Sequence, residues 1–311
     1  MSHFYVEILN EISEDVLIFL NRFFRYQNSI QEMEHFSFGG SENSNRLYVV
    51  KNDGAISAIY GVLDNKVFID NVAYDFGLAN YMAIDPILRS PRFFADLSNA
   101  VFECEAKLGT KAIFGPPNRD GYIAHKALAG WSDLVTLSTL VVSGRGVDCN
   151  DPNFKMGGEF SDAHVGLACS VLQAFRFRMA RSLNWYKWRY TDFPRRDYQI
   201  ASYYTGAELA AFAVLKEWRG GDGGQTCHIM EIHAKNVDVE EALIASIVAS
   251  RSSEWNINVW CHNKDPSFAL YQSLGFRVAS QQPIIFRSLD NRLQMPVGEA
   301  TRFFFGDADG Y

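Results

Sequence analysis

The sequence predicts an α+β protein made of two similar halves, each a mixed, mostly antiparallel central sheet flanked by helices. Three observations lead to this prediction: a weak internal repeat, alternating apolar runs joined by turn signals, and apolar residues at helical spacing that end in glycine. The chain has 311 residues, of which 48% are hydrophobic. That length suits two domains of about 150 residues each.

The internal repeat consists of two pairs of segments that occur in the same order. Residues 53–62 (DGAISAIYGV) resemble residues 205–214 (TGAELAAFAV), with a turn glycine followed by similar apolar residues. Residues 113–131 resemble residues 258–276 in the same way. In the second pair an asparagine precedes a glycine by the same distance in both copies: Asn118 and Gly130, Asn263 and Gly275. Together these matches indicate an internal duplication.

The boundary between the copies is marked by a change in composition. Residues 143–162 are rich in Gly, Asp and Asn, which is typical of a linker. We therefore predict an N-terminal domain at 1–145, a linker at 146–162 and a C-terminal domain at 163–311.

The elements of the first copy follow from local signals. Alternating apolar runs over 46–63 are joined by Asn52-Asp53-Gly54, a strong hairpin signal, and 66–85 predicts one long strand or two with a break at Gly77. Ser90 and Pro91 are suited to begin a helix that ends at Gly109. The remaining expected elements are a strand at 111–115, a helix at 120–130 and a strand at 134–142.

The second copy predicts the same order of elements. Helices within 163–190 come first, and the later elements are strands at 198–204 and 208–218, a glycine-rich loop at 219–224, a strand at 227–234, a helix at 239–255, a strand at 257–261, a helix, and a strand at 282–289.

Composition and charge exclude several classes of function. The net charge of −7 and the pI near 5.5 argue against a nucleic-acid binder, and no apolar run is long enough to cross a membrane. The N-terminus lacks a basic leader and a long apolar stretch, so we expect a cytoplasmic protein without a signal peptide. Five scattered cysteines without CxxC spacing predict reduced thiols and no zinc or other metal site.

The order of elements and four segments resemble the GNAT superfamily of N-acetyltransferases, in a tandem arrangement of two copies. Two segments show the resemblance most clearly. Residues 263–276 (NKDPSFALYQSLGF) are similar to the family's Asn…Tyr-x-x-x-Gly-Phe segment. Residues 82–97 (MAIDPILRSPRFFADL) stand where the family has its phosphate-binding loop. Residues 185–194 and 303–309 also look like segments of tandem GNAT proteins. The resemblance implies acetyl-CoA or another acyl-CoA as the donor and a primary amine as the acceptor.

The resemblance also implies where the donor would lie. Its pyrophosphate would rest on amides at a helix N-terminus after a central strand, and its pantetheine arm between two diverging strands. In the first copy the implied contacts are Ala83, Ile84, Arg89, Ser90, Arg92, Phe93, Phe94, Asn118 and Tyr122. The family's glycines are replaced here by Ser90, Arg92 and Phe94, and Asn118 is equally suited to cap the next helix.

Electrostatics favours the first copy as the donor site. Arg89 and Arg92 flank its helix start without an acid in the first turn, although both are also typical of solvated helix-end charges. In the second copy we expect Asp238 to cap the helix, with Glu241 completing a capping box and Glu240 adding negative charge. A pyrophosphate there would meet like charge.

Five residues are candidates for proton transfer. Tyr271 matches the position at which this family often carries its acid, whereas the first copy has Lys126 there and offers Tyr122 or His125 instead. Tyr271 is equally suited to be a core aromatic with a paired hydroxyl, and His125 to lie on a helix surface.

The other two candidates lie on one strand. Strict alternation places Glu231 and His233 on one face of the strand and His228 on the other. Glu231 and His233 are then able to act together as a base whose pKa values are shifted by their contact.

The resulting hypothesis is an acyl-CoA-dependent N-acyltransferase, with acetyl-CoA as donor. The acceptor would be a small-molecule amine such as an amino sugar, bound near the junction of the two domains. Two alternatives stay open: a degenerate, non-catalytic binding or assembly module, and an aminoacyl-transferring relative that takes charged tRNA. The net charge disfavours the tRNA reading.

Overall fold

The structure is a computed structural model that describes residues 6–24, 27, 29–39, 44–147, 151–194, 197–220, 224–299 and 301–308. Part of the expected linker, including Cys149, lies outside these residues. The cysteines that are described, Cys104, Cys169, Cys227 and Cys261, are free thiols.

The first part of the chain opens with a short strand and two helices and continues through a strand-rich segment, residues 45–143, which we call the first half. The elements are β1 (Glu7–Ile8), α1 (Glu14–Asn21), α2 (Ile30–Phe38), β2 (Asn45–Asn52), β3 (Ala55–Ile69), β4 (Val72–Ile84), the 3-10 helix η1 (Pro86–Leu88), α3 (Pro91–Leu108), β5 (Ala112–Gly115), α4 (Arg119–Leu128) and β6 (Ser132–Ser143).

The later part repeats this order in residues 198–288, which we call the second half. Before it come β7 (Phe154–Met156), α5 (Asp162–Leu172), β8 (Phe177–Met179), α6 (Leu183–Tyr186) and the π-helix η2 (Lys187–Thr191). Its own elements are β9 (Tyr198–Thr205), β10 (Glu208–Arg219), β11 (Gln225–Ala234), α7 (Val237–Ser250), β12 (Trp255–His262), α8 (Ser267–Ser273) and β13 (Arg277–Ser288), and the short helix η3 (Phe305–Asp307) follows.

The strands form one mixed sheet, which confirms the predicted α+β class. The order of the sheet is β1-β2-β3-β4-β5-β13-β6-β12-β11-β10-β9-β7, with β8 paired to β3. No helix among the described residues is both long enough and apolar enough to span a bilayer.

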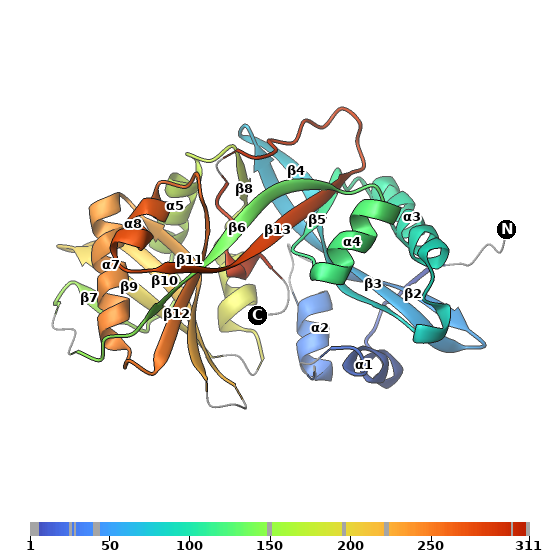
Figure 1. Cartoon of the computed structure of the whole chain (residues 1–311), viewed down its shortest axis with the longest axis horizontal. Helices are drawn as coiled ribbons and strands as arrows, with labels where there is room; N and C mark the ends of the chain where they lie inside the picture. The colour runs from blue at the N-terminus through green and yellow to red at the C-terminus, as the bar shows by residue number, and fades with distance from the viewer. Residues whose placement is uncertain are drawn as a thin grey trace.

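The last strands of the two halves are exchanged in the middle of this sheet (Figure 1). β6 of the first half pairs with β12 of the second, and β13 of the second half pairs with β5 of the first. The two exchanged strands also pair with each other. The sheet therefore runs without interruption across the expected domain boundary, and the division at 145 and 163 stays a prediction.

Several local predictions are confirmed. Asp53 and Gly54 have positive φ angles of 50° and 82° in the turn between β2 and β3. The Ser90 hydroxyl caps α3 by accepting a hydrogen bond from the Phe93 amide, and Pro91 occupies the first turn. Gly109 ends the helix in the left-handed region.

Two local predictions are wrong. Residues 66–85 form neither one strand nor two strands with a break at Gly77. Asp70 and Asn71 adopt positive φ angles of 49° and 67° in a hairpin turn between β3 and β4, and β4 runs through Gly77. The N-cap of α7 is Asn236 and not Asp238, since the Asn236 side chain accepts from the Val239 amide at 3.0 Å. Asn is as good a cap as Asp, and it lies two residues earlier.

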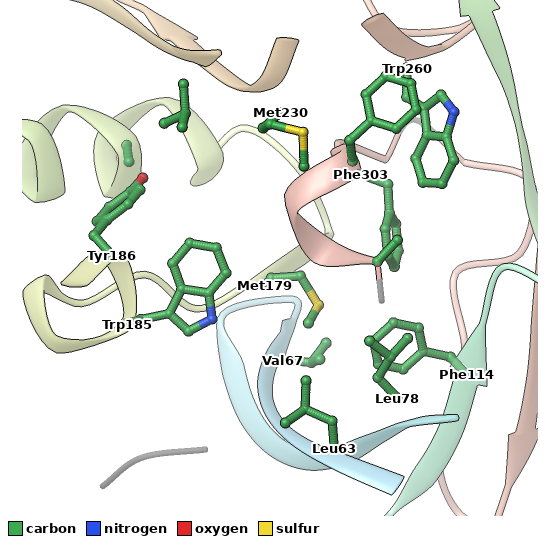
Figure 2. Packing of buried hydrophobic residues seen from close by; sticks show 14 of the residues in the cluster. Leu63, Val67, Leu78, Phe114, Met179, Trp185, Tyr186, Met230, Trp260 and Phe303 are labelled. Atoms are coloured by element: carbon green, nitrogen blue, oxygen red, sulfur yellow. The ribbon is translucent and has the colours of Figure 1, made fainter. Parts of the chain in front are cut away.

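A large aromatic core joins the two halves (Figure 2). Phe303, from the C-terminal segment, packs against Phe114 of β5 and Phe177 of β8, each at 5.6 Å between ring centroids. Met230 and Trp260 of the second half belong to the same buried cluster. The C-terminal segment thus lies between the halves and touches both.

Candidate functional site

A gap opens between β4 and β5 in the first half. The two strands pair in parallel only through Phe76–Leu78 and Ala112–Phe114. Beyond these pairs β4 continues to Ile84, whereas β5 ends at Gly115. The gap lies at the carboxyl ends of the two strands, the edge at which open sheets place ligands.

β4 carries a bulge at this gap. Gly61 of β3 is opposite Asn80 and Ile59 is opposite Ala83, so β4 has one extra residue over this stretch. Within the bulge Tyr81 has a φ angle of 42°, in the left-handed region. Such a conformation costs a non-glycine residue about 1–3 kcal/mol and is concentrated at functional sites.

Asn80 is buried at the bulge without a hydrogen-bond partner. The residue is 7% exposed, and neither its Oδ1 nor its Nδ2 is bonded. The side chain lies over Gly61, because a Cβ at that position would be 1.9 Å from Asn80 Oδ1. An unpaired buried amide costs about 1–3 kcal/mol, so this position is kept at an energetic cost.

The start of α3 is positive and exposed. Pro91 has no amide hydrogen and the Phe93 amide is bonded to Ser90, which leaves the Arg92 amide in the first turn. The Arg89 Nε donates to the Ile84 carbonyl at 3.0 Å, and the guanidinium lies over the Phe23 ring. The Arg92 side chain is 78% exposed and 3.7 Å from Asp96.

The other implied donor contacts lie at the end of β4, in the first turn of α3 and at the start of α4. Ala83 and Ile84 are buried at the end of β4, Phe93 is half-buried, and Phe94 is buried against the His125 ring. Asn118 caps α4, since its Oδ1 accepts from the Gly121 amide at 2.7 Å. Tyr122 donates to Asp133 at 2.8 Å on the exposed side of α4, where Lys126 also pairs with Asp133.

His125 is buried, in contrast to its alternative reading as a surface residue. Its Nδ1 donates to the Gly121 carbonyl at 2.7 Å, which leaves Nε2 to accept from the Tyr60 hydroxyl at 3.2 Å. Burial lowers the pKa of His125, so the ring is neutral near pH 7. Tyr60 lies opposite the bulge of β4, between Ile59 and Gly61.

The corresponding gap of the second half is filled by the chain itself. β11 and β12 pair in parallel from Gln225 to Ile229 and then separate. Residues 301–308 occupy the space beyond, and those with a side chain are all buried. Phe305 packs on Trp260 at 4.5 Å, and Phe304 packs on His233 at 5.1 Å between ring centroids.

Arg302 holds this C-terminal segment at the starts of α7 and α8. Its Nε and Nη2 donate to Asp265 at 2.9 Å, and Nη2 also donates to the Ser267 hydroxyl at 2.6 Å. Glu240 of α7 lies 3.9 Å from the guanidinium. A groove of about 680 Å³ runs outside, between α5 and the starts of α7 and α8, and Arg302 forms part of its wall.

Glu231 and His233 lie on the same face of β11, as predicted, at the centre of a buried network. Glu231 accepts hydrogen bonds from His233 Nε2 at 2.6 Å, Arg181 Nε at 2.7 Å, Tyr186 at 2.7 Å and Tyr190 at 3.1 Å. Burial opposes its charge, but Arg181 and the His233 hydrogen bond outweigh burial and lower the pKa of Glu231 to about 2. Burial lowers the pKa of His233.

His228 does not lie on the opposite face, so strict alternation is wrong for this strand. Val214 is opposite Glu231 and Leu215 is opposite Ile229, which makes Met230 a bulge. The extra residue resets the alternation and brings His228 to the side of His233. Accordingly, the His228 ring packs on Phe305 of the C-terminal segment at 5.4 Å.

Tyr271 is a core residue with a paired hydroxyl. It is 2% exposed and donates to Glu240 Oε1 at 2.6 Å. Burial and the Glu240 carboxylate raise its pKa well above the ordinary value. The structure thus places Tyr271, Glu231 and His233 in the second half, apart from the Arg89 and Arg92 side of the first half.

Sequence reasoning missed Asn80, Tyr81 and Arg302. The signal for the first two is a single polar residue inside the apolar run at 76–84. Nothing local to Arg302 indicates that it pairs with Asp265, because the contact joins residues far apart in the chain.

Buried and partly buried neutral histidines predict a loss of stability in acid. Burial lowers the pKa of His125 and His164, and with Lys216 it lowers the pKa of His228 to about 4. These groups titrate near about 6.5 when unfolded, so the unfolded chain binds more protons as the pH falls below that value. We expect urea unfolding to give a smaller free energy at pH 5 than at pH 7.5, and His228→Gln to show a weaker pH dependence. The same pH dependence in both proteins would contradict this account of His228.

The comparisons with known proteins identify the fold. No protein-family model and no curated protein sequence matches the chain. Among solved structures, a GCN5-related N-acetyltransferase from Anabaena variabilis aligns with a TM-score of 0.69 at 9% identity, over 92% of this chain and 73% of that chain. A probable N-acyltransferase from Enterococcus faecalis, a conserved protein of unknown function, aligns with 0.69 at 13% identity, over 92% and 72%.

A third structure, a GCN5-related N-acetyltransferase from Kribbella flavida, aligns with a TM-score of 0.65 at 12% identity, over 92% of this chain and 71% of that chain. At such low identity the likeness establishes the fold, and the chain has the GNAT fold. This confirms the GNAT-type fold predicted from the sequence, whereas the tandem arrangement of two copies stays a prediction.

Proposed function

We propose that the protein is an acyl-CoA-dependent N-acyltransferase that binds its donor, acetyl-CoA, in the first half. One observation carries this proposal. The β4–β5 gap ends at a strained bulge with an unpaired buried amide, whereas the matching gap of the second half is occupied by the protein's own C-terminal segment. A thioester donor would supply an activated acyl carbon for attack by an amine.

The residues present fit such a donor. Arg89 and Arg92, with the remaining first-turn amide of α3, favour an anionic group at this helix start. Ala83 and Ile84 form the end of β4 that leads toward this helix start. In the second half Glu240 lies in the first turn of α7, 3.9 Å from Arg302. A pyrophosphate therefore has no comparable place at this helix start.

We assign proton transfer in the first half to Tyr60 and His125, which lie on the α3 and α4 face of the sheet, the donor's side of the bulge. Tyr60 is opposite the bulge and donates to the neutral His125 ring, which is held in one tautomer by the Gly121 carbonyl. Tyr271 and Glu231 are locked in hydrogen bonds of the second half.

The acceptor would be a small-molecule primary amine such as an amino sugar, approaching from the α1 and α2 side of the bulge. This side lies beside the segment that precedes the second half, because His35 of α2 and Trp188 of η2 exchange hydrogen bonds at 2.8 and 3.2 Å. The location agrees with an acceptor site near the junction of the halves.

The donor assignment is tested by calorimetric titration of acetyl-CoA. The double variant Arg89→Glu/Arg92→Glu reverses both charges at the start of α3 and is expected to weaken binding by a factor of about 100 or more, through lost charge-assisted contacts and new repulsion. Lys235→Glu is the matched control, because it reverses a charge beside α7. Unchanged binding by the double variant, or a larger loss in the control, would contradict the assignment.

A non-catalytic acyl-CoA-binding module is the second candidate. It is favoured by the Ser90 hydroxyl, because this hydroxyl accepts a hydrogen bond from the Phe93 amide, which would otherwise face the phosphates. Saturable binding of acetyl-CoA without thiol release on any amine would support this candidate over the enzyme.

A further inference from the structure

Three buried polar side chains on the α1 and α2 side of the first half lack hydrogen-bond partners. They are Ser37 of α2, Asn45 of β2 and Asn80 of β4, which are 0%, 2% and 7% exposed. Neither the Ser37 hydroxyl nor any nitrogen or oxygen of the two carboxamides is bonded. We call these three residues the polar layer.

Strand register places the two carboxamides on one face of the sheet. Asn45 is opposite Leu63 of β3, and Asn80 is opposite Gly61, two residues away on the same strand. Alternation puts Asn45 on the side of Leu47, which packs with α1 and α2. Because Gly61 has no side chain, the Asn80 carboxamide extends over it toward β2.

Ser37 faces the same layer from the helix. It lies one turn after Met33, and residues four apart share a helix face. Met33 is buried in the cluster that contains Leu47. The Ser37 hydroxyl therefore points from α2 toward the sheet.

Two buried carboxylates elsewhere in this protein show the usual pairing. Glu105, under the opposite face of the first half, accepts from Arg46, Tyr48 and Thr110 at 2.6–2.7 Å. Glu231 in the second half accepts from four donors. Each unpaired group of the polar layer is costly to bury, and a bound group that pairs with it would remove that cost.

The chemistry of the layer defines what it binds. A carboxamide and a hydroxyl each donate and accept hydrogen bonds, and none of the three carries charge. The complementary group is therefore uncharged and also both donates and accepts, which describes a hydroxyl or a carboxamide. An alkyl group would leave the layer unpaired.

We propose that the polar layer binds an uncharged hydroxyl or carboxamide group of the acceptor, next to the amine that is acylated. The inference rests on the proposed function, because it takes Asn80 at the bulge of β4 as the neighbour of the donor's acyl carbon. Tyr81 and α2 cover the layer in the free protein: the Tyr81 ring is half-buried and packs edge-on against Phe36 and Phe24 at 5.9 Å. Entry of the acceptor group requires the Tyr81 ring to move aside.

The test compares three small amines of similar size as acceptors with acetyl-CoA as donor. Ethanolamine carries a hydroxyl, glycinamide a carboxamide, and propylamine neither. Thiol release is measured for the full chain, and kcat/KM is expected to be about tenfold or more higher for at least one of the polar amines than for propylamine. The better of the two polar amines identifies the bound group.

The variants Asn80→Leu and Asn45→Leu test the residues themselves. Each is expected to reduce the preference for the polar amine to less than about threefold, and to raise the unfolding temperature, since an unpaired buried amide is removed. Ser98→Ala on α3 is the matched control, because Ser98 is also fully buried with an unbonded hydroxyl. It is expected to raise the unfolding temperature without changing the preference.

The outcomes separate this inference from the proposed function. Equal kcat/KM for the three amines in the wild type, or an unchanged preference in both Leu variants, would mean that the layer holds water only and would overturn the inference alone. Acetyl-CoA binding without acylation of any of the three amines would overturn the inference as stated, while the donor site would stand. Absence of acetyl-CoA binding would contradict the proposed function and the inference with it.

Discussion

Replacing Arg181 with methionine is expected to lower the free energy of unfolding by roughly 3–5 kcal/mol, the usual cost of breaking a buried ion pair from one side. Arg181 is fully buried, and its Nε and Nη2 donate to Glu231 at 2.7 Å and to Asp307 at 2.6 Å. The variant leaves two carboxylates in the interior without their cation. Urea denaturation followed by tryptophan fluorescence measures the loss.

The control for this prediction is another arginine that bridges two acids. Arg176 pairs with Asp70 at 2.6 Å and Glu299 at 2.5 Å, but its side chain is half exposed. Arg176→Met is expected to change stability little, because exposed pairs are screened by solvent. Similar losses of unfolding free energy in the two variants would show that burial does not determine how much the Arg181 ion pairs contribute to stability.

Separating the chain into residues 1–145 and 146–311 is expected to prevent both parts from folding. β6 would lose β12 and β13, and β13 would lose β5 and β6, so that each part would expose unpaired strand edges and half of the aromatic core. We expect each part to be insoluble or without cooperative unfolding by circular dichroism.

Co-expression of the two parts provides the control. Together they are expected to form a soluble complex with one unfolding transition, because all of the strand pairs are available again. A part that unfolds cooperatively by itself as a monomer would contradict the view that the exchanged strands complete each half.

The elements that sequence reasoning predicted are those fixed by nearby residues. Asp53 and Gly54 form their turn because both accept positive φ angles between two alternating runs, and Ser90 begins α3 because its hydroxyl reaches an amide three residues on. The turn at Asp70 and Asn71 was missed because it lacks the glycine that marks the turn at Gly54, and apolar residues resume directly after it. The exchange of β6 and β13 has no local signal, since it depends on which sheet edges meet.

The same distinction applies to the candidate site. Arg89 and Arg92 stand beside a helix start that the sequence marks clearly. The bulge at Asn80 and Tyr81 depends on the register with β3, so alternation within β4 alone is not able to reveal it. The apolar run at 303–305 predicts burial, but only the fold places it in the gap between β11 and β12.

The central claim, that the donor lies in the first half, is tested most directly by hydrogen exchange of the full chain with and without saturating acetyl-CoA. We predict slower exchange of backbone amides at residues 80–94 and 118–122, with no change at 230–241 or 301–308. Protection at 230–241, or faster exchange at 301–308, would mean that the donor enters the second half and displaces the C-terminal segment, which would contradict the account.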